Sequence, residues 1–171
     1  MTKPDPSLLD GAVAPAVLDV MRMASSALTA LGIRHVVVGG LAVSANGHLS
    51  ATRVVDFLVG DEAFEHHPGG FVSMKPGVPI QVNGITIDLL SVQAGEDHLA
   101  SALEAPMGSI IEAPPPVYLK LQSLRHKDRT DIIELIKAGI DVQACRAYLK
   151  AHAPGLVAMF EDAVARAAAE E

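Results

Sequence analysis

The sequence predicts an α/β fold of the α+β type, in which helices flank a small mixed sheet and a helical part ends the chain. Short β-branched runs alternate with helical patterns in the first half, Asn83-Gly84 joins two of those runs, and helical patterns dominate after about Gly95. Elements in this order bury their apolar sides in one sheet with helices packed on it. The 171 residues suit a single domain over 1–171, with its core at about 15–112 and a helical C-terminal part at about 113–171.

Two helices and two strands are expected before residue 60. Apolar residues recur at helical spacing from Pro15 to Leu31, and the proline at the start favours a helix N-terminus. Ile33–Val38 is short and β-branched, which indicates a buried strand. Gly39-Gly40 is expected to end that strand, Leu41–Ala45 to form a short helix, and Arg53–Val59 to form the second strand.

A β-hairpin is expected after a loop at about 60–77. Val78–Val82 and Ile85–Leu90 are β-rich runs separated by Asn83-Gly84. Both turn residues tolerate the positive φ of a tight hairpin, so this is a strong local signal.

The C-terminal part is expected to hold a series of helices. Three prolines, Pro114 to Pro116, precede a helix that runs to about Arg125. Asp128 is expected to cap the next helix and Asp141 a third, because aspartate accepts hydrogen bonds from free backbone N–H groups. The last helix is Ala-rich, and it either packs on the domain or forms a dimer face.

Charge and composition exclude several classes of protein. The net charge of −7, from 13 Lys and Arg against 20 Asp and Glu, argues against general nucleic-acid binding. No apolar run reaches the roughly 20 residues of a spanning helix, and the N-terminus lacks the pattern of a signal peptide. A lone cysteine, Cys145, allows no internal disulfide and fits a reducing compartment. We therefore expect a cytoplasmic protein that does not act at a membrane.

The first candidate site element is the pair Gly39-Gly40, which lies between a strand and a helix. Without a Cβ, the backbone can approach a phosphate, and the helix N-terminus offers free N–H groups. A plain tight turn is the structural alternative.

The second element is a pair of acids, Asp56 and Asp88, each the single acid in an apolar strand. Strand alternation places each acid on the face opposite its apolar neighbours. Burying an unpaired charge is costly, so each acid needs a metal, a cation or an open strand end. On neighbouring strands the two could hold one Mg²⁺ or Mn²⁺ together with the phosphates of a nucleotide.

In this order the segments resemble the nucleotidyltransferase superfamily, in the minimal bacterial branch that includes AbiEii-type toxins. The similarity covers about residues 33–139, and its segments are Val38–Ala42, His48–Val59, Ile85–Leu90, Val117–Leu121 and Asp128–Ile132. The resemblance implies a protein that binds a metal–nucleoside triphosphate and transfers a nucleoside monophosphate to an acceptor hydroxyl. The acceptor class stays open between a small molecule, RNA and protein.

The resemblance also implies roles for individual residues. Gly39, Gly40 and Lys120 would bind the phosphates of the nucleotide. Arg53 is also expected at the phosphates, where its charge would take the place of a metal ion. Asp56 and Asp88 would be the metal ligands and the catalytic carboxylates. For Lys120 a surface lysine is the structural alternative. The charges themselves indicate that Arg125, Lys127 and Arg129 extend a basic patch, with solvated charges at a helix junction as the alternative. Helix capping is the first explanation for Asp128 and Asp131.

One departure from the family pattern bears on the function. Val54 stands where the family has the first acid of its Asp-x-Asp motif, and Ser50 stands where relatives often have arginine. Valine cannot ligate a metal, so one of the two metal sites is lost or weakened. The alternative function is therefore a catalytically degenerate module that binds a nucleotide or a protein partner, such as a component of a toxin–antitoxin or regulatory pair.

Overall fold

The computed structural model describes residues 3–65, 78–123 and 125–170, and it confirms the α/β class. Most of the loop expected at 60–77 lies outside the described residues. The strands are β1 His35–Val38, β2 Val54–Val59, β3 Ile80–Val82 and β4 Ile85–Ser91. The α-helices are α1 Pro15–Ala30, α2 Gly39–Ala45, α3 Asp97–Ala100, α4 Pro115–Ser123, α5 His126–Lys137, α6 Val142–His152 and α7 Val157–Ala169. Short 3₁₀ helices lie at Pro6–Leu9, Asp61–Phe64, Ser101–Glu104 and Pro154–Leu156.

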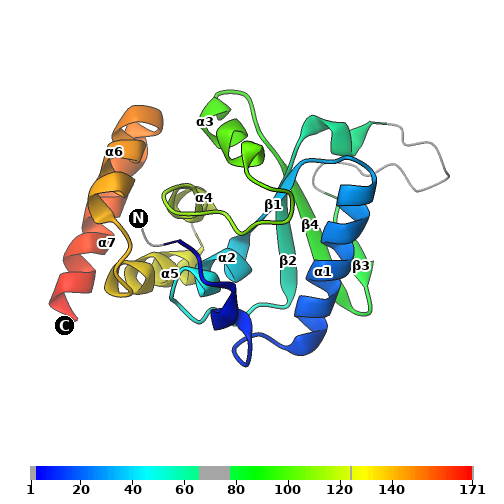
Figure 1. Cartoon of the computed structure of the whole chain (residues 1–171). Helices are drawn as coiled ribbons and strands as arrows, with labels where there is room; N and C mark the ends of the chain where they lie inside the picture. Colours follow the sequence, from blue (N-terminus) through cyan, green and yellow to red (C-terminus); the bar gives the residue numbers. More distant parts are fainter. Residues whose placement is uncertain (1–2, 66–77, 124, 171) are drawn as a thin grey trace.

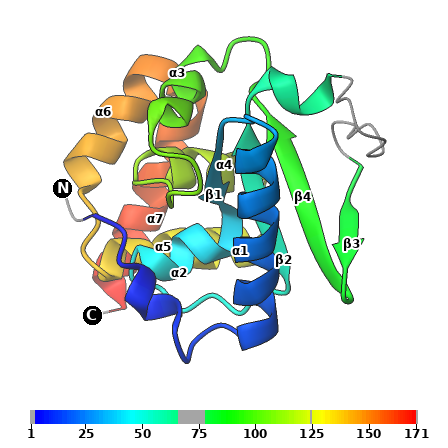
Figure 2. The same ribbon diagram turned by 45° about the vertical axis from the view of Figure 1, so that its right-hand side comes forward.

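The four strands form one mixed sheet in the order β1-β2-β4-β3. β2 pairs with β1 in antiparallel and with β4 in parallel orientation, and β3 pairs with β4 as the expected hairpin. The hairpin forms one edge of the sheet (Figure 2). At the other edge Val37 donates to the carbonyl of Ser109 at 2.8 Å and accepts from the N–H of Ile111 at 3.0 Å.

Helices cover both faces of the sheet. α1 lies across one face, α2, α4 and α5 lie on the other side, and α6 and α7 form the outermost layer (Figure 1). Two apolar clusters match these layers. Val55, Phe57 and Val59 of β2 are buried in the cluster that includes α1, whereas Leu58 is buried in the cluster of α4 to α7. The side chains of β2 therefore alternate as expected, and the polar positions of the two parallel strands face α4 and α5.

Several local predictions are confirmed. Asn83 and Gly84 have φ values of 51° and 76°, which fit a two-residue turn with positive φ at both positions. The side chain of Asp141 accepts a hydrogen bond from the N–H of Ala144 at the start of α6. Both signals act within a few residues, so the sequence pattern alone defines them.

Two helix starts differ from the prediction. α2 begins at Gly39, not at Leu41, so the glycine pair forms its first turn. α5 begins at His126 with Arg125 as the N-cap residue, so the prediction that Asp128 caps this helix is wrong. Asp128 lies inside the first turn, and it is fully buried because it binds side chains of α4 and of the α4–α5 junction.

Among the described residues, none of the helices combines the length and the apolar character that crossing a membrane would require.

Candidate functional site

Asp56 and Asp88 occupy directly paired positions of the parallel strands β2 and β4. Because side chains at paired positions of neighbouring strands lie on the same face, the two carboxylates project together toward α4 and α5. The sequence placed each acid on its own strand, and the register of the sheet brings the two together.

Both acids line one pocket of about 490 Å³, which we call the carboxylate pocket. It is bounded by the start of α2, the loop that leads into β2, the C-terminal half of β4 and the α4–α5 junction. Its lining comprises Gly39, Gly40, residues 51–54, Asp56, Val78, residues 88–90, Lys120, Arg125 and Lys127. All six residues expected at the site (Gly39, Gly40, Arg53, Asp56, Asp88 and Lys120) therefore contribute to one surface.

Gly39 is required by its contact with Asp56. Its φ is +66°, and a Cβ at this position would overlap with Oδ2 of Asp56 and lie 2.7 Å from its Cγ. Gly40 is also close-packed, since a Cβ there would lie 3.0 Å from Cβ of Thr52. The glycine pair thus lets the first turn of α2 close tightly over the acid of β2.

The surroundings of Asp56 disfavour the ionised form of its carboxyl group. Burial and the negative charge of Asp88 raise the pKa of Asp56 from 3.8 to about 6, although the charges of Lys120 and Arg125 oppose the rise. Hydrogen bonding does not contribute to this pKa, because no donor among the described residues serves the Asp56 carboxylate. An additional cation beside the two carboxylates would relieve this repulsion.

Lys120 lies in the wall of the pocket, and it is only 8% exposed. Its Nζ donates to Oδ1 of Asp128 at 2.6 Å and to Oδ2 of Asp131 at 2.8 Å. Neither aspartate is a helix cap, so the capping explanation for both is wrong. The alternative of a surface lysine is also wrong, because the ammonium is enclosed by two buried carboxylates.

Asp128 accepts from more than one side. Although its burial opposes ionisation, hydrogen bonds from Lys120, Ser123 and Arg125 lower the pKa of Asp128 from 3.8 to about 2. The Nε of Arg125 donates to Oδ2 of Asp128 at 2.7 Å. Asp128 therefore stays ionised throughout the neutral range and holds Lys120 and Arg125 in place.

The loop before β2 is tied to α5 by contacts that surround the pocket. Nζ of Lys127 donates to the carbonyl of Ala51 at 2.6 Å. Asp131 lies 3.4 Å from Nε2 of His48 and accepts from Oγ of Ser50 at 3.5 Å. These contacts tie residues 48–51, which lead into the pocket lining at 51–54, to α5.

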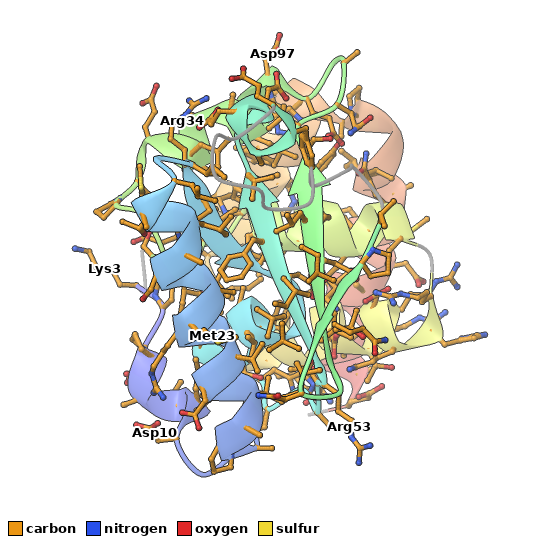
Figure 3. All side chains as sticks on the ribbon, turned by 90° about the vertical axis from the view of Figure 1, so that its right-hand side faces the viewer. Lys3, Asp10, Met23, Arg34, Arg53 and Asp97 are labelled. Atoms are coloured by element: carbon orange, nitrogen blue, oxygen red, sulfur yellow. The ribbon has the colours of Figure 1, made fainter. Side chains whose placement is uncertain are left out.

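Arg53, the remaining basic residue of the lining, lies just before β2 and is exposed. It projects outward at one end of the sheet, opposite the end that carries Arg34 (Figure 3). Arg129, which sequence reasoning grouped with the same basic patch, lines a separate and smaller cavity between α5 and α7. The expected patch is thus divided between two places.

The ion pairs around the site bear on which ion fits it. Lys120 and Arg125 pair with Asp128 and Asp131, so these four charges balance. Asp56 and Asp88 form no ion pair among the described residues, and Arg53 and Lys127 are exposed cations of the same lining. Two carboxylates plus ligand phosphates are the ligands that Mg²⁺ commonly takes in proteins, so the residues fit one divalent ion.

A second ion does not fit equally well. Val54 also lies in the pocket lining, and its side chain has no atom that could ligate a metal. No cluster of three or more His, Cys, Asp or Glu side chains suited to a metal occurs in the ranges 3–65, 78–123 and 125–170. The acids of the pocket lining are therefore Asp56 and Asp88, with no third carboxylate beside them in the described part of the chain.

Sequence reasoning missed the buried role of Asp128 and Asp131, although a signal was present. Positions 128, 131, 132 and 135 recur at helical spacing and form the buried side of α5. Acids on the buried side of an amphipathic helix require a buried cation, and Lys120 was the available partner.

A comparison with protein-family models found no match for this chain, and neither did a search of curated proteins.

Proposed function

We propose that this chain is a nucleotidyltransferase-fold protein that binds a nucleoside triphosphate with one Mg²⁺ or Mn²⁺ in the carboxylate pocket. The observation that carries the proposal is the direct pairing of Asp56 and Asp88 on β2 and β4 in a pocket that also presents basic side chains. Two acids favour a hard divalent cation, and cations at the rim favour the phosphates that the same ion would bind.

The proposed ligand arrangement follows from the positions of the charges. Asp56 and Asp88 would hold the ion at the floor of the pocket. Gly39 and Gly40 would allow the phosphate chain to approach the backbone, with Arg53 and Lys120 adding positive charge. The ion, when bound, supplies Lewis-acid chemistry and neutralises the triphosphate.

Transfer of the nucleoside monophosphate is the second candidate function. In that reaction an acceptor hydroxyl oxygen bonds to the α-phosphorus, the α–β phosphoanhydride bond breaks, and pyrophosphate leaves. A carboxylate of the pair would take the proton of the hydroxyl. Val54 disfavours efficient turnover, because valine cannot supply the third carboxylate. Binding without turnover, as in a regulatory or toxin–antitoxin component of the cytoplasm, is therefore the preferred form of the proposal.

Calorimetry tests the binding step. The chain is titrated with each of the four nucleoside triphosphates, with Mg²⁺ or with EDTA. We expect binding that depends on Mg²⁺ and that weakens by at least about tenfold in Asp56→Asn and in Asp88→Asn, since each removes a charged ligand. The exposed Asp97→Asn is the matched control and should bind as the parent chain does. If no triphosphate binds to the parent chain, the proposal is wrong.

Pyrophosphate release tests the transfer step. Slow or undetectable release is expected from the parent chain with Mg²⁺ or Mn²⁺. Val54→Asp should increase release if position 54 is the main deficiency. Efficient release by the parent chain would show that one ion suffices and would move the protein into the class of active enzymes.

A further inference from the structure

We infer that Arg125, held by the buried carboxylate of Asp128, contacts the phosphate chain directly. In that role it supplies positive charge that a second metal ion would otherwise supply. The inference rests on the proposed function and gives a specific phosphate-binding role to a residue that the sequence placed only in a basic patch.

The side chain of Arg125 is held by Asp128 and still has free N–H donors. Arg125 is the N-cap residue of α5, at the junction with α4, and its side chain is 74% exposed. Its Nε donates to Oδ2 of Asp128 at 2.7 Å and its Nη2 to Oδ1 at 3.4 Å. A guanidinium carries five N–H donors, so three remain for a ligand while two keep the plane oriented.

The positive charge of Arg125 is only partly neutralised by Asp128. Asp128 is fully buried and also accepts hydrogen bonds from Lys120 and Ser123, so its charge is shared among several donors. The charge of Arg125 also acts on Asp56, because the two groups perturb each other across the pocket. Arg125 thus lies where it can meet an anion bound beside the carboxylate pair.

The other basic residues of the pocket lining are less available to a ligand than Arg125. Lys120 is almost fully buried, and two of its three donors bind Asp128 and Asp131. Lys127 is directed to the backbone carbonyl of Ala51. Arg53 projects away from the body of the protein at the end of the sheet (Figure 3). Arg125 combines exposure to the pocket with attachment to a buried carboxylate, and its planar fork suits phosphate oxygens.

Position 54 carries valine where the Asp-x-Asp motif of the proposed family has its first acid. With Val54 in place of an acid, the pocket lining supplies no third carboxylate to recruit a second ion. Part of the negative charge of a triphosphate must then be balanced by protein cations. A guanidinium fixed beside the pocket meets that requirement without a metal.

The experiment separates phosphate binding from metal binding. Inorganic triphosphate with Mg²⁺ is titrated into the parent chain, Arg125→Gln, Arg125→Lys and the control Arg129→Gln, which alters an arginine of α5 that lies outside the pocket. Mn²⁺ alone is titrated in parallel and followed by electron paramagnetic resonance. Circular dichroism checks that each variant keeps the parent fold.

The expected result is a weakening of triphosphate binding by about 10- to 100-fold in Arg125→Gln, as for loss of charged hydrogen bonds. Arg125→Lys should recover part of the affinity, and Arg129→Gln should match the parent chain. All four proteins should bind one Mn²⁺ with similar affinity.

The possible negative results distinguish the proposed function from the role of Arg125. If the parent chain binds no nucleoside triphosphate, the proposed function itself fails. If the parent chain binds nucleotides and Arg125→Gln binds inorganic triphosphate equally well, only the role of Arg125 is overturned. A nucleotide-binding parent chain that does not bind inorganic triphosphate, or an Arg125→Gln variant that also loses Mn²⁺, would overturn that role as well.

Discussion

Gly39 leaves no room for a side chain beside Asp56, because a Cβ at position 39 would lie 2.7 Å from Cγ and 2.9 Å from Cβ of the aspartate. The positive φ of Gly39 adds a second constraint, since residues with side chains rarely adopt it. The backbone of α2 and the acid of β2 therefore depend on each other.

Gly39→Ala should displace Asp56 and destabilise the protein. We expect a loss of about 2 kcal/mol or more in the free energy of unfolding, from strain at positive φ and from the steric overlap. Mg²⁺–nucleotide binding should weaken in the same variant. Gly155→Ala is the control, because nothing lies within 4 Å of a Cβ there. Equal urea denaturation midpoints for the two variants would contradict the packing argument.

Asp56→Asn should change how stability depends on pH. The pKa of Asp56 is raised from 3.8 to about 6, so between these values the folded state binds more protons than the unfolded state. The contribution of Asp56 to the free energy of unfolding therefore falls as pH rises from about 4 to about 6, by on the order of 3 kcal/mol. Because Asn carries no charge, the variant should be more stable than the parent chain at neutral pH and comparable to it near pH 4.

Denaturant unfolding of both proteins across this pH range measures the difference directly. A parent-to-variant difference that stays constant with pH would contradict an unfavourable charge at Asp56. Adding Mg²⁺ at neutral pH should stabilise the parent chain and leave the variant unchanged, because only the parent keeps both carboxylates.

Lys120→Met should be strongly destabilising. The substitution preserves most of the side-chain volume and leaves Asp128 and Asp131 buried without their shared ammonium. Breaking a buried ion pair on one side costs about 3–5 kcal/mol. Lys137→Met removes a lysine that also binds two carboxylates, those of Glu134 and Glu170, but at the surface.

The two lysine variants are compared by thermal unfolding. The Lys137 variant should stay close to the parent chain, since surface ion pairs contribute little. A similar shift in both variants would show that burial of the Lys120 cluster has no special importance. Combining Lys120→Met with Asp128→Asn should recover part of the lost stability, because one uncompensated charge is removed.

Asp141→Ala should lower the free energy of unfolding by about 1 kcal/mol, the usual effect of removing an N-cap aspartate. The carboxylate of Asp141 accepts from the N–H of Ala144 at 2.8 Å, and this bond satisfies a free donor of α6. Asp19→Ala, at an exposed position in the second turn of α1, is the control and should change stability little, because its ion pair with Arg22 is exposed. Equal denaturation midpoints for the parent chain and Asp141→Ala would rule out a stabilising cap.

The sequence by itself determined the features that depend on neighbouring residues. Apolar spacing defined α1, positive-φ residues Asn83 and Gly84 defined the hairpin turn, and Asp141 marked the start of α6. Alternation along β2 also showed that Asp56 lies on the face opposite Val55 and Phe57. These signals act within a strand, a turn or one helical turn, so no distant residue is needed to interpret them.

Only the tertiary structure decided what lies beside these residues. The parallel register of β2 and β4 places Asp56 opposite Asp88, and the packing of α4 against α5 encloses Lys120 between Asp128 and Asp131. Asp128 looked like a helix cap because its spacing fits both roles. Strand register and the pairing of buried charges depend on segments far apart in the chain, and local patterns do not specify which partner a buried charge will meet.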